Sequence, residues 1–317
     1  MDIKQLNWFQ TALQLRGSVV KIVLPRVAVV GIFGLLISVL YNFGLPVSWR
    51  ILGSVITNVV FNFVLGLLLV FRTNTAYERF WEGRKAWGTL VVNVRNLSRQ
   101  IQVGIADAEL SDRQSKSAVL RLLVAFAVAT KLHLRHEQPN QELKALLTPE
   151  QGQQILEVKN PPLKVAFWIG SYLKKECDRG YLNISILVPM NTLLDNLVEA
   201  LTTCERILKT PIPLAYAIYL QRLLLIYCIF LPFQMVEDLG WYTGIITAVI
   251  SFILFGIEEI GREIENPFGY DANDLPLDEI CTNMLYNVEE LMLAAESDRP
   301  LVNLSADNLS VVESNRE

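Results

Sequence analysis

The sequence predicts an all-α membrane protein with four transmembrane helices and a further helical region in water, and three observations support this fold class. The chain has 317 residues, of which 52% are hydrophobic, and its mean hydropathy of +0.33 is too high for an ordinary soluble protein. Only 19% of the residues are charged, and these are clustered. No stretch alternates polar and apolar residues in the manner of a strand.

Four apolar segments are candidates to cross a bilayer, and the first can be entered as early as Val19. Short connections pair them into two hairpins, 27–41 with 51–71 and 212–236 with 239–257. The segment 51–71 is the clearest, because its 21 residues span roughly 30 Å at about 1.5 Å per residue, the thickness of a hydrocarbon core. Arg222 interrupts the third segment, and it either faces protein or water inside the membrane or marks the point where the helix crosses the interface.

Basic residues predict the orientation of the chain. The short connections within the hairpins hold only Arg50, whereas the stretch 72–99 holds six lysines and arginines. By the positive-inside rule, this stretch and both termini lie in the cytoplasm. We expect a cytosolic or interfacial N-terminal segment at 1–26 and a first membrane hairpin at 27–71. A helical cytosolic region at 72–211 separates it from a second membrane hairpin at 212–257. A cytosolic C-terminal segment with a tail follows at 258–317.

The region between the hairpins is expected to be helical. The stretch 118–134 is apolar but only 17 residues long and carries Arg121 and Lys131, so we interpret it as a buried helix of the soluble part, not as a fifth span. Leucines recur near one face of 187–209, which predicts an amphipathic helix. The prolines and the glycine of 137–162 predict loops and short helices in this stretch.

The junction at Arg72 is the most informative feature of the chain. The uncharged segment 51–71 runs directly into a charged and aromatic stretch with no turn signal between them, which predicts one helix that leaves the membrane and continues into water. Along this helix an apolar residue recurs every four positions and stays on one slowly drifting face. These residues, the ladder, are Val55, Val59, Phe63, Leu67 and Phe71.

The ladder has two interpretations. It is either an ordinary stripe that faces lipid or core, or a hydrophobic constriction that several copies would form around an axis. Asn58 and Asn62 lie beside the ladder and favour the second interpretation, because an asparagine in a membrane is costly unless it meets water or a partner. Gly66 would let another helix approach closely.

Other candidate groups in the sequence point to no enzyme and no bound metal. His133, His136 and Glu137 could share a helical face, but a third ligand is not evident, and the alternative is a solvated basic cluster with Lys131 and Arg135. No catalytic motif is present, and the acidic residues of 187–209 are expected on an ordinary helix surface: Asp195, Glu199 and Glu205. The four cysteines form no paired motif, and the net charge of −4 favours no nucleic-acid partner.

Two sequence motifs together resemble the bestrophin family, in its bacterial and plant branch. They are FRTNTAYERFWEGRKAWG at 71–88 and IENPFGYDANDLPLDEIC at 264–281, and the Thr-Pro-Ile-Pro segment at 210–213 also fits. The resemblance covers roughly residues 5 to 290. It implies a homopentameric ion channel with four membrane helices per subunit and a large helical cytosolic part, whose partners are its own copies, the lipid bilayer and permeant ions.

The resemblance also implies which residues line the conduit. The second span of the family lines a hydrophobic neck, and the matching positions here are Phe63 and Leu67 with Val59 or Phe71, depending on the register. A second, cytosolic constriction falls near the residues Ile184, Ile186 and Val188. Animal members bind calcium through an acidic cluster after Asn-Pro-Phe-Gly, but Tyr270 and Ala272 replace ligands here. We therefore expect no calcium cofactor, although Asp271 and Asp274 leave a weak cation site open.

The expected function is a passive channel for chloride or a similar monovalent anion such as bicarbonate. Copies of Arg72 and its basic neighbours would attract anions to the inner mouth. One alternative is a sodium-selective relative that uses the carboxylates of Glu258, Glu259 and Asp195. Another alternative, from a different class, is a non-conducting membrane scaffold that docks a soluble partner through its helical part.

Overall fold

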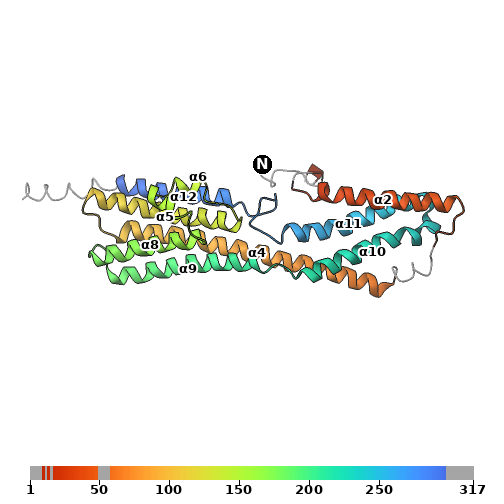
Figure 1. Ribbon diagram of the computed structural model, residues 1–317, viewed down its shortest axis with the longest axis horizontal. Coiled ribbons are helices and arrows are strands. Elements are labelled where there is room, and N and C mark those ends of the chain that lie inside the picture. Colours follow the sequence, from red (N-terminus) through yellow and green to blue (C-terminus); the bar gives the residue numbers. More distant parts are fainter. Residues whose placement is uncertain (1–8, 11–12, 15–16, 49–57, 298–317) are drawn as a thin grey trace, which may run out of the picture. The chain divides into compact units, whose positions relative to one another are not determined.

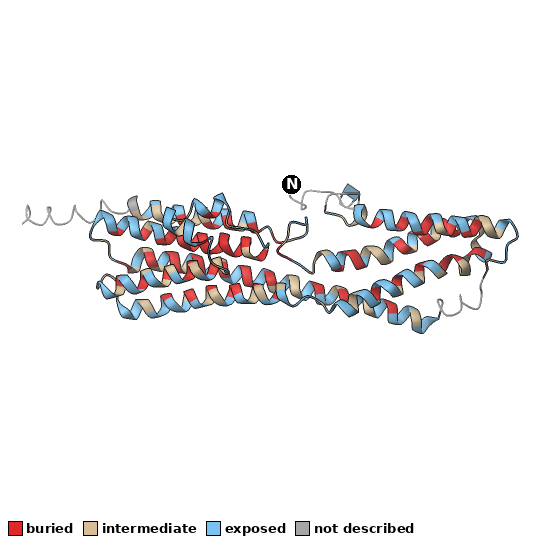
Figure 2. Ribbon diagram, in the orientation of Figure 1, coloured by how far each residue is buried: buried red, intermediate tan, exposed pale blue. Residues whose placement is uncertain are grey.

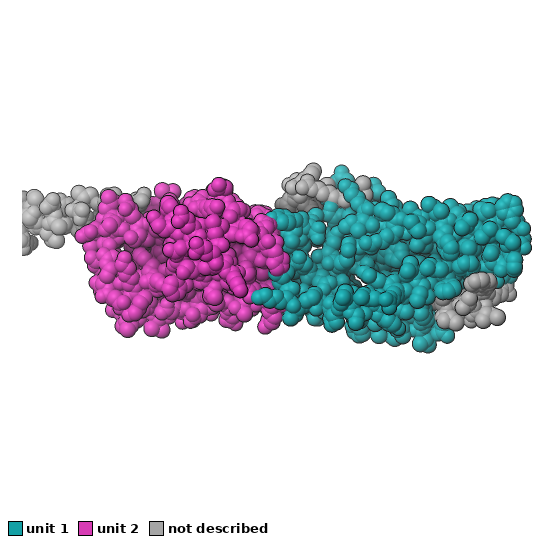
Figure 3. Space-filling model, in the orientation of Figure 1, with its two compact units in different colours: residues 1–82, 207–275 teal, residues 83–206, 276–317 magenta. Residues whose placement is uncertain are grey.

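The computed structural model describes residues 9–10, 13–14, 17–48 and 58–297, and its regular secondary structure there is helical. An isolated antiparallel bridge between Ile105 and Leu182 is the only β pairing in these residues. The chain divides into two compact units (Figure 3). Unit 1 comprises residues 1–82 and 207–275, and unit 2 comprises residues 83–206 and 276–317.

Unit 1 contains the helices that correspond to the expected membrane hairpins. These are α2 (Val20–Asn42), the first part of α4 (Val59–Gly104), α10 (Leu214–Leu239) and α11 (Thr243–Glu263), with a short 3-10 turn, η2 (Gly240–Tyr242), between the last two (Figure 1). The expected segments at 27–41, 212–236 and 239–257 therefore agree with helices of slightly different bounds. Residues 51–57 of the second segment, with Val55, lie outside the described residues, as does Arg50.

Small residues form the contact between α2 and α11. A Cβ atom added at Gly34 would lie 3.0 Å from the Cα of Gly244, and one added at Gly31 would lie 3.1 Å from the Cβ of Ala248. The buried hydroxyl of Thr247 donates to the backbone carbonyl of Thr243, one turn earlier in the same helix, at 2.7 Å. Small residues and satisfied hydroxyls let helix backbones approach closely, as in membrane proteins.

Unit 2 is built around α5 (Leu110–Leu134). The other helices are the remainder of α4, α6 (Gln141–Lys144), α7 (Pro149–Gln154), α8 (Pro161–Asp178), most of α9 (Ile184–Lys209) and α12 (Leu277–Ser297). Leu120, Leu123 and Phe126 of α5 are fully buried, and buried residues gather on this helix in Figure 2. The prediction that 118–134 is a buried helix is confirmed, although α5 is long and apolar enough to count as a candidate span by composition.

The length of α4 confirms that the helix continues past the junction. It runs without interruption from Val59 to Gly104, so the charged stretch after Phe71 belongs to the same helix as the ladder. By length and composition, five stretches of the described residues could cross a membrane: Val20–Asn42, Val59–Gly104, Leu110–Leu134, Ile184–Lys209 and Leu214–Glu263. Composition alone therefore does not separate the expected spans from a helix buried in unit 2.

Candidate functional site

The ladder lies on the face of α4 that the rest of unit 1 leaves uncovered. Leu65 and Leu69 are buried against Leu220 and Leu224 of α10. At roughly 100° per residue, a residue two positions away lies about 160° around the helix. Phe63 and Leu67 are each two positions from Leu65, so they lie almost opposite it, on the exposed side of α4. The exposed fraction of Phe63 is 68%, and Val59 and Phe71 are exposed as well. Four ladder residues thus form an apolar strip that faces away from the core of the unit.

The asparagines beside the ladder bond to their own helix. The carboxamide oxygen of Asn58 accepts from the backbone amide of Val60 at 2.8 Å, which is the bond that a helix N-cap makes. Asn62 Nδ2 donates to the carbonyl of Asn58 at 3.3 Å. Both side chains are exposed. No atom of another described segment lies within 4 Å of a Cβ position at Gly66, so the described residues do not make the close helix approach expected there.

Arg72, which we expected at the inner mouth, is buried and paired within the single chain; its role at a mouth stays a prediction. Its side chain is only 4% exposed, and its Nη2 lies 2.8 Å from Oε2 of Glu265 in an ion pair. The reason is the helical period: Arg72 follows Leu65 by seven residues, or two turns, and therefore shares its buried face. In the single chain Arg72 does not present its charge on the face of the ladder.

Arg72 belongs to a cluster that joins three segments of unit 1. The other carboxylate oxygen of Glu265 accepts from the backbone amide of Ile212 at 2.9 Å, just before α10. Arg79, two turns after Arg72, donates from Nε to the carbonyl of Glu265 at 3.2 Å. The guanidinium of Arg79 also donates to the carbonyl of Ile207 at 2.6 Å, and to that of Thr210. We call Arg72, Arg79 and Glu265 the arginine–glutamate cluster.

The carboxylates of α11 that could have served cation selectivity have partners inside unit 1. Glu259 is fully buried, and its Oε2 lies 2.9 Å from Nη1 of Arg26, while Arg262 bonds to its other oxygen. Glu258 is buried too and accepts from Nε2 of Gln221 at 3.0 Å. Arg222 is exposed on α10. Asp195, the third proposed carboxylate, is exposed on α9 in unit 2.

The residues expected at a cytosolic constriction open α9. Ile184, Ile186 and Val188 lie in its first turns, and more than a third of each residue is exposed. A Cβ atom at Gly104 of α4 would lie 3.1 Å from Cγ2 of Ile186, so that side chain also packs against the end of α4. Their role in a constriction stays a prediction.

The acidic residues after α11 stabilise a turn. The carboxylate of Asp274 accepts from the backbone amide of Asp271 at 2.8 Å, and the carbonyl of Asp271 accepts from the amide of Asp274 at 3.0 Å. Asn273 donates to Glu263 at 2.7 Å and to the carbonyl of Gly17 at 3.2 Å. No cluster of three or more histidine, cysteine or carboxylate side chains that could hold a metal ion occurs in the described residues. The weak cation site stays a prediction.

His133 and Lys131 differ from the solvated cluster that the sequence suggested, whereas His136 is exposed. Lys131 is 2% exposed, and its Nζ lies 2.7 Å from Glu142 and 2.8 Å from Asp278. Burial alone would lower the pKa of Lys131, but hydrogen bonds to these two carboxylates raise it. His133 Nε2 lies 2.9 Å from Oε1 of Glu205, which is half-buried and not on an ordinary helix surface.

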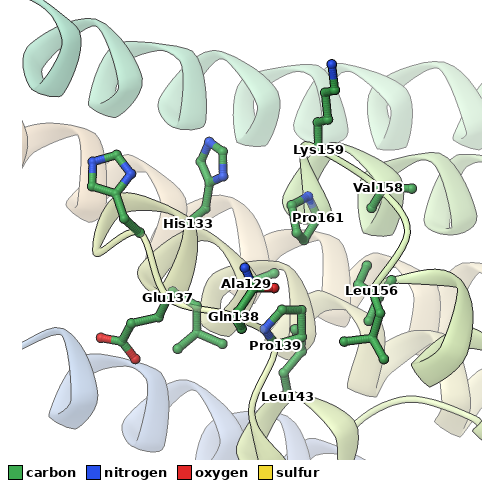
Figure 4. Close-up of a pocket in the computed structure, with 13 residues that line it drawn as sticks. Ala129, His133, Glu137, Gln138, Pro139, Leu143, Leu156, Val158, Lys159 and Pro161 are labelled. Atoms are coloured by element: carbon green, nitrogen blue, oxygen red, sulfur yellow. The ribbon is translucent and has the colours of Figure 1, made fainter.

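A cavity of about 250 Å³ lies beside His133 in unit 2 (Figure 4). Its lining includes Leu143 and Leu156, while Lys159 extends away from these two side chains. The polar partner of His133, Glu205, also accepts from Asn160 Nδ2 at 2.9 Å. His133 is therefore held in unit 2 by packing and by its contact with Glu205.

Comparison with known proteins identifies the family of this chain. The model of the family described as “Bacterial/Fungal Bestrophin protein” matches residues 1–290. The chain belongs to this bestrophin family. A voltage-dependent anion channel-forming protein from Nostoc sp. is 57% identical over 291 residues, which cover 92% of this chain and 94% of that protein. The protein of the same name from Escherichia coli is 31% identical over 299 residues, with 93% and 94% covered.

Solved structures agree with the family. A crystal structure of a bacterial bestrophin homolog from Klebsiella pneumoniae has a TM-score of 0.76 at 29% identity, and covers 85% of this chain and 98% of that one. The resemblance deduced from the two sequence motifs is therefore confirmed. Family membership and the apolar helices of unit 1 together make this bestrophin an integral membrane protein.

Sequence reasoning missed Glu265 as a residue of interest. Its carboxylate and its carbonyl contact α4, and the carboxylate also holds the start of α10. The available signal was its place directly before Asn266-Pro267 in the second motif, next to a helix that ends at Glu263. A carboxylate at the end of a membrane helix needs a partner, but hydropathy does not say which one.

Proposed function

We propose that this bestrophin is a passive channel for monovalent anions, and that copies of α4 surround its conduit. One observation carries the proposal: the ladder residues Val59, Phe63, Leu67 and Phe71 are exposed on the side of α4 opposite its contact with α10. The names of the relatives from Nostoc sp. and Escherichia coli support anions as the permeant species. Chloride is the expected ion, with bicarbonate as a second substrate.

The ladder acts as a hydrophobic neck in this proposal. Rings of apolar side chains around a narrow axis expel water and so raise the barrier to ion passage. One chain cannot form a ring, so the neck requires several copies, and family resemblance makes a homopentamer the expected assembly. The proposed topology places the four helices of unit 1 in the membrane, with both termini and the large helical region in the cytoplasm.

The structure favours anions over the sodium alternative. That alternative relied on Glu258, Glu259 and Asp195. The first two carboxylates are buried and bonded within unit 1, whereas Asp195 is exposed. A carboxylate that already faces an arginine offers little attraction to a passing cation. Glu259 is balanced in this way by Arg26 and Arg262.

Flux through the full-length protein in liposomes tests the proposal. Phe63→Ala should widen the neck, and if it lowers the barrier by about 1.4 kcal/mol, the rate of chloride efflux rises about tenfold. Phe252→Ala is the matched control, because Phe252 is an exposed phenylalanine on α11 and not on α4, and we expect its flux to equal that of the wild type. Unchanged flux in Phe63→Ala would reject the neck.

Ion substitution separates the alternatives. In a chloride gradient, the reversal potential of the purified protein in a bilayer should move toward the chloride equilibrium potential. A shift toward the sodium equilibrium potential would support the cation-selective alternative instead. The non-conducting scaffold predicts no flux from the wild type and no effect of Phe63→Ala.

A further inference from the structure

The arginine–glutamate cluster attaches one face of α4 to two other segments of unit 1. Glu265 holds Arg72 with one carboxylate oxygen and the amide of Ile212 with the other, at 2.8 and 2.9 Å. Arg79, two helical turns after Arg72, adds to this attachment because its guanidinium donates to the carbonyls of Glu265 and Ile207. The helix is thereby bonded both to the end of α11 and to the connection that leads into α10.

Burial makes this attachment depend on charge. Arg72 is only 4% exposed, and a Cβ atom at Gly261 of α11 would lie 3.5 Å from its Cγ, so α11 covers the side chain. Its Nη1 is buried and has no hydrogen-bond partner among the described residues. A buried guanidinium that loses its counter-charge is strongly unfavourable, and it would move toward water or another anion.

The helical geometry links that movement to the ladder. Arg72 lies on the buried face of α4 with Leu65 and Leu69, and Phe63 and Leu67 lie on the opposite face. A rotation that brings Arg72 toward water turns the two faces through the same angle, because all of these residues belong to one unbroken helix. The direction of the ladder therefore depends on the partner of Arg72.

We propose that Glu265 is a positioning residue that sets the rotation of α4 about its own axis and so aims the ladder at the conduit. The inference rests on the proposed function, since it assigns the ladder to a neck. It differs from the expectation drawn from sequence, in which Arg72 acts on the ion directly. In this proposal the charge of Arg72 pairs with Glu265, and this pair affects conduction by setting the position of α4.

Labelling of the ladder tests this inference. The background carries Cys177→Ser, because Cys177 is half-buried while Cys204, Cys228 and Cys281 are buried. Phe63→Cys then reports, through its rate of reaction with a membrane-impermeant thiol reagent in liposomes, whether position 63 faces the conduit. Glu265→Gln should slow labelling about tenfold and lower chloride flux, the size of effect that coupled residues show.

A second substitution gives the decisive comparison. Arg72→Met with Glu265→Gln removes both charges and keeps an oxygen that can accept from Ile212, so labelling and flux should return to within about twofold of the wild type. Arg72→Met alone should have a smaller effect than Glu265→Gln, and it serves if Glu265→Gln does not fold. Glu263→Gln is the matched control, because Glu263 bonds to Asn273 outside the cluster, and it should change neither measurement.

The outcomes separate this inference from the proposed function. Failure of the double variant to recover, or unchanged labelling in both single variants, would overturn the role of Glu265. A wild type without flux would reject the channel, but recovery of the labelling rate by the double variant would still establish that Glu265 positions α4. Phe63→Cys should be labelled faster with Glu265 present than with Glu265→Gln. Equally slow labelling of these two proteins would also overturn the inference.

Discussion

The contact of α2 with α11 in unit 1 and the surroundings of α5 in unit 2 are two different ways to pack apolar helices. The first uses glycine, alanine and threonine, and leaves large apolar side chains such as Ile32 and Val249 exposed on the outside. The second buries large side chains such as Phe126 and Leu123 completely. Both sets of helices are apolar enough to cross a membrane by composition.

The proposed topology, which places unit 1 in the membrane and unit 2 in water, explains this difference. Water drives large apolar side chains into a core, as in unit 2. Lipid gives no such drive, so helices in a membrane associate through close backbone approach and satisfied hydroxyls, as α2 and α11 do. The comparison teaches that the size of the residues between helices separates membrane from soluble packing where hydropathy does not.

The largest expected effect comes from the same substitution made in each region. Phe126→Ala removes a fully buried ring from α5 and should lower the free energy of unfolding by about 3–5 kcal/mol. Phe63→Ala removes an exposed ring from α4 and should change it by about 0.5 kcal/mol or less. Thermal unfolding of the detergent-solubilised protein measures both, and equal losses would contradict the assignment of the two faces.

A smaller effect is expected at the crossing of α2 and α11. A Cβ atom at Gly244 would lie 2.4 Å from Cγ of Leu35 and 2.8 Å from its backbone nitrogen. Gly244→Ala should therefore destabilise the protein by about 1–3 kcal/mol through overpacking. Gly256→Ala on the same helix is the control, because no other described segment lies within 4 Å of its Cβ position, and alanine there should be neutral or slightly stabilising. The melting temperatures of the two variants decide.

The smallest effect is a pH dependence that belongs to unit 2. Burial would raise the pKa of Asp278, but hydrogen bonds from Lys131 and Arg135 lower it below its usual 3.8. Its contribution to stability is thus present above pH 3.8 and is lost as the pH falls through the folded pKa. The raised pKa of Lys131 makes its own contribution complete below pH 10.5 and lost as the pH rises above that value.

Lys131→Met tests this dependence. It should make the loss of stability toward acid shallower, because Asp278 then keeps only Arg135 as a partner. Lys174→Met removes an exposed lysine that faces Asp178, and it should leave the acid slope unchanged, since exposed pairs contribute little. Melting temperatures between pH 3 and 7 provide the measurement, and parallel curves for Lys131→Met and the wild type would contradict the role of the pair Lys131 and Asp278.

Much of the fold was predictable because its signals are local. Apolar stretches at 27–41, 212–236 and 239–257 marked helices, and the absence of a turn after Phe71 predicted the continuous α4. The four-residue period placed the ladder on one face of that helix, which follows from helix geometry alone. The two motifs of the family were also readable, because they are contiguous in the chain.

By itself, the sequence determined the helical class, the apolar segments, the ladder and the family, since each depends on neighbouring residues. Only the tertiary structure decided that Arg72 is buried against Glu265, that Glu258 and Glu259 have partners, and that Lys131 joins Glu142 to Asp278. The physical reason is that a charge in an apolar setting must find a partner, and that partner can come from any part of the chain. The period of a helix fixes which residues share a face, but packing decides which face is covered.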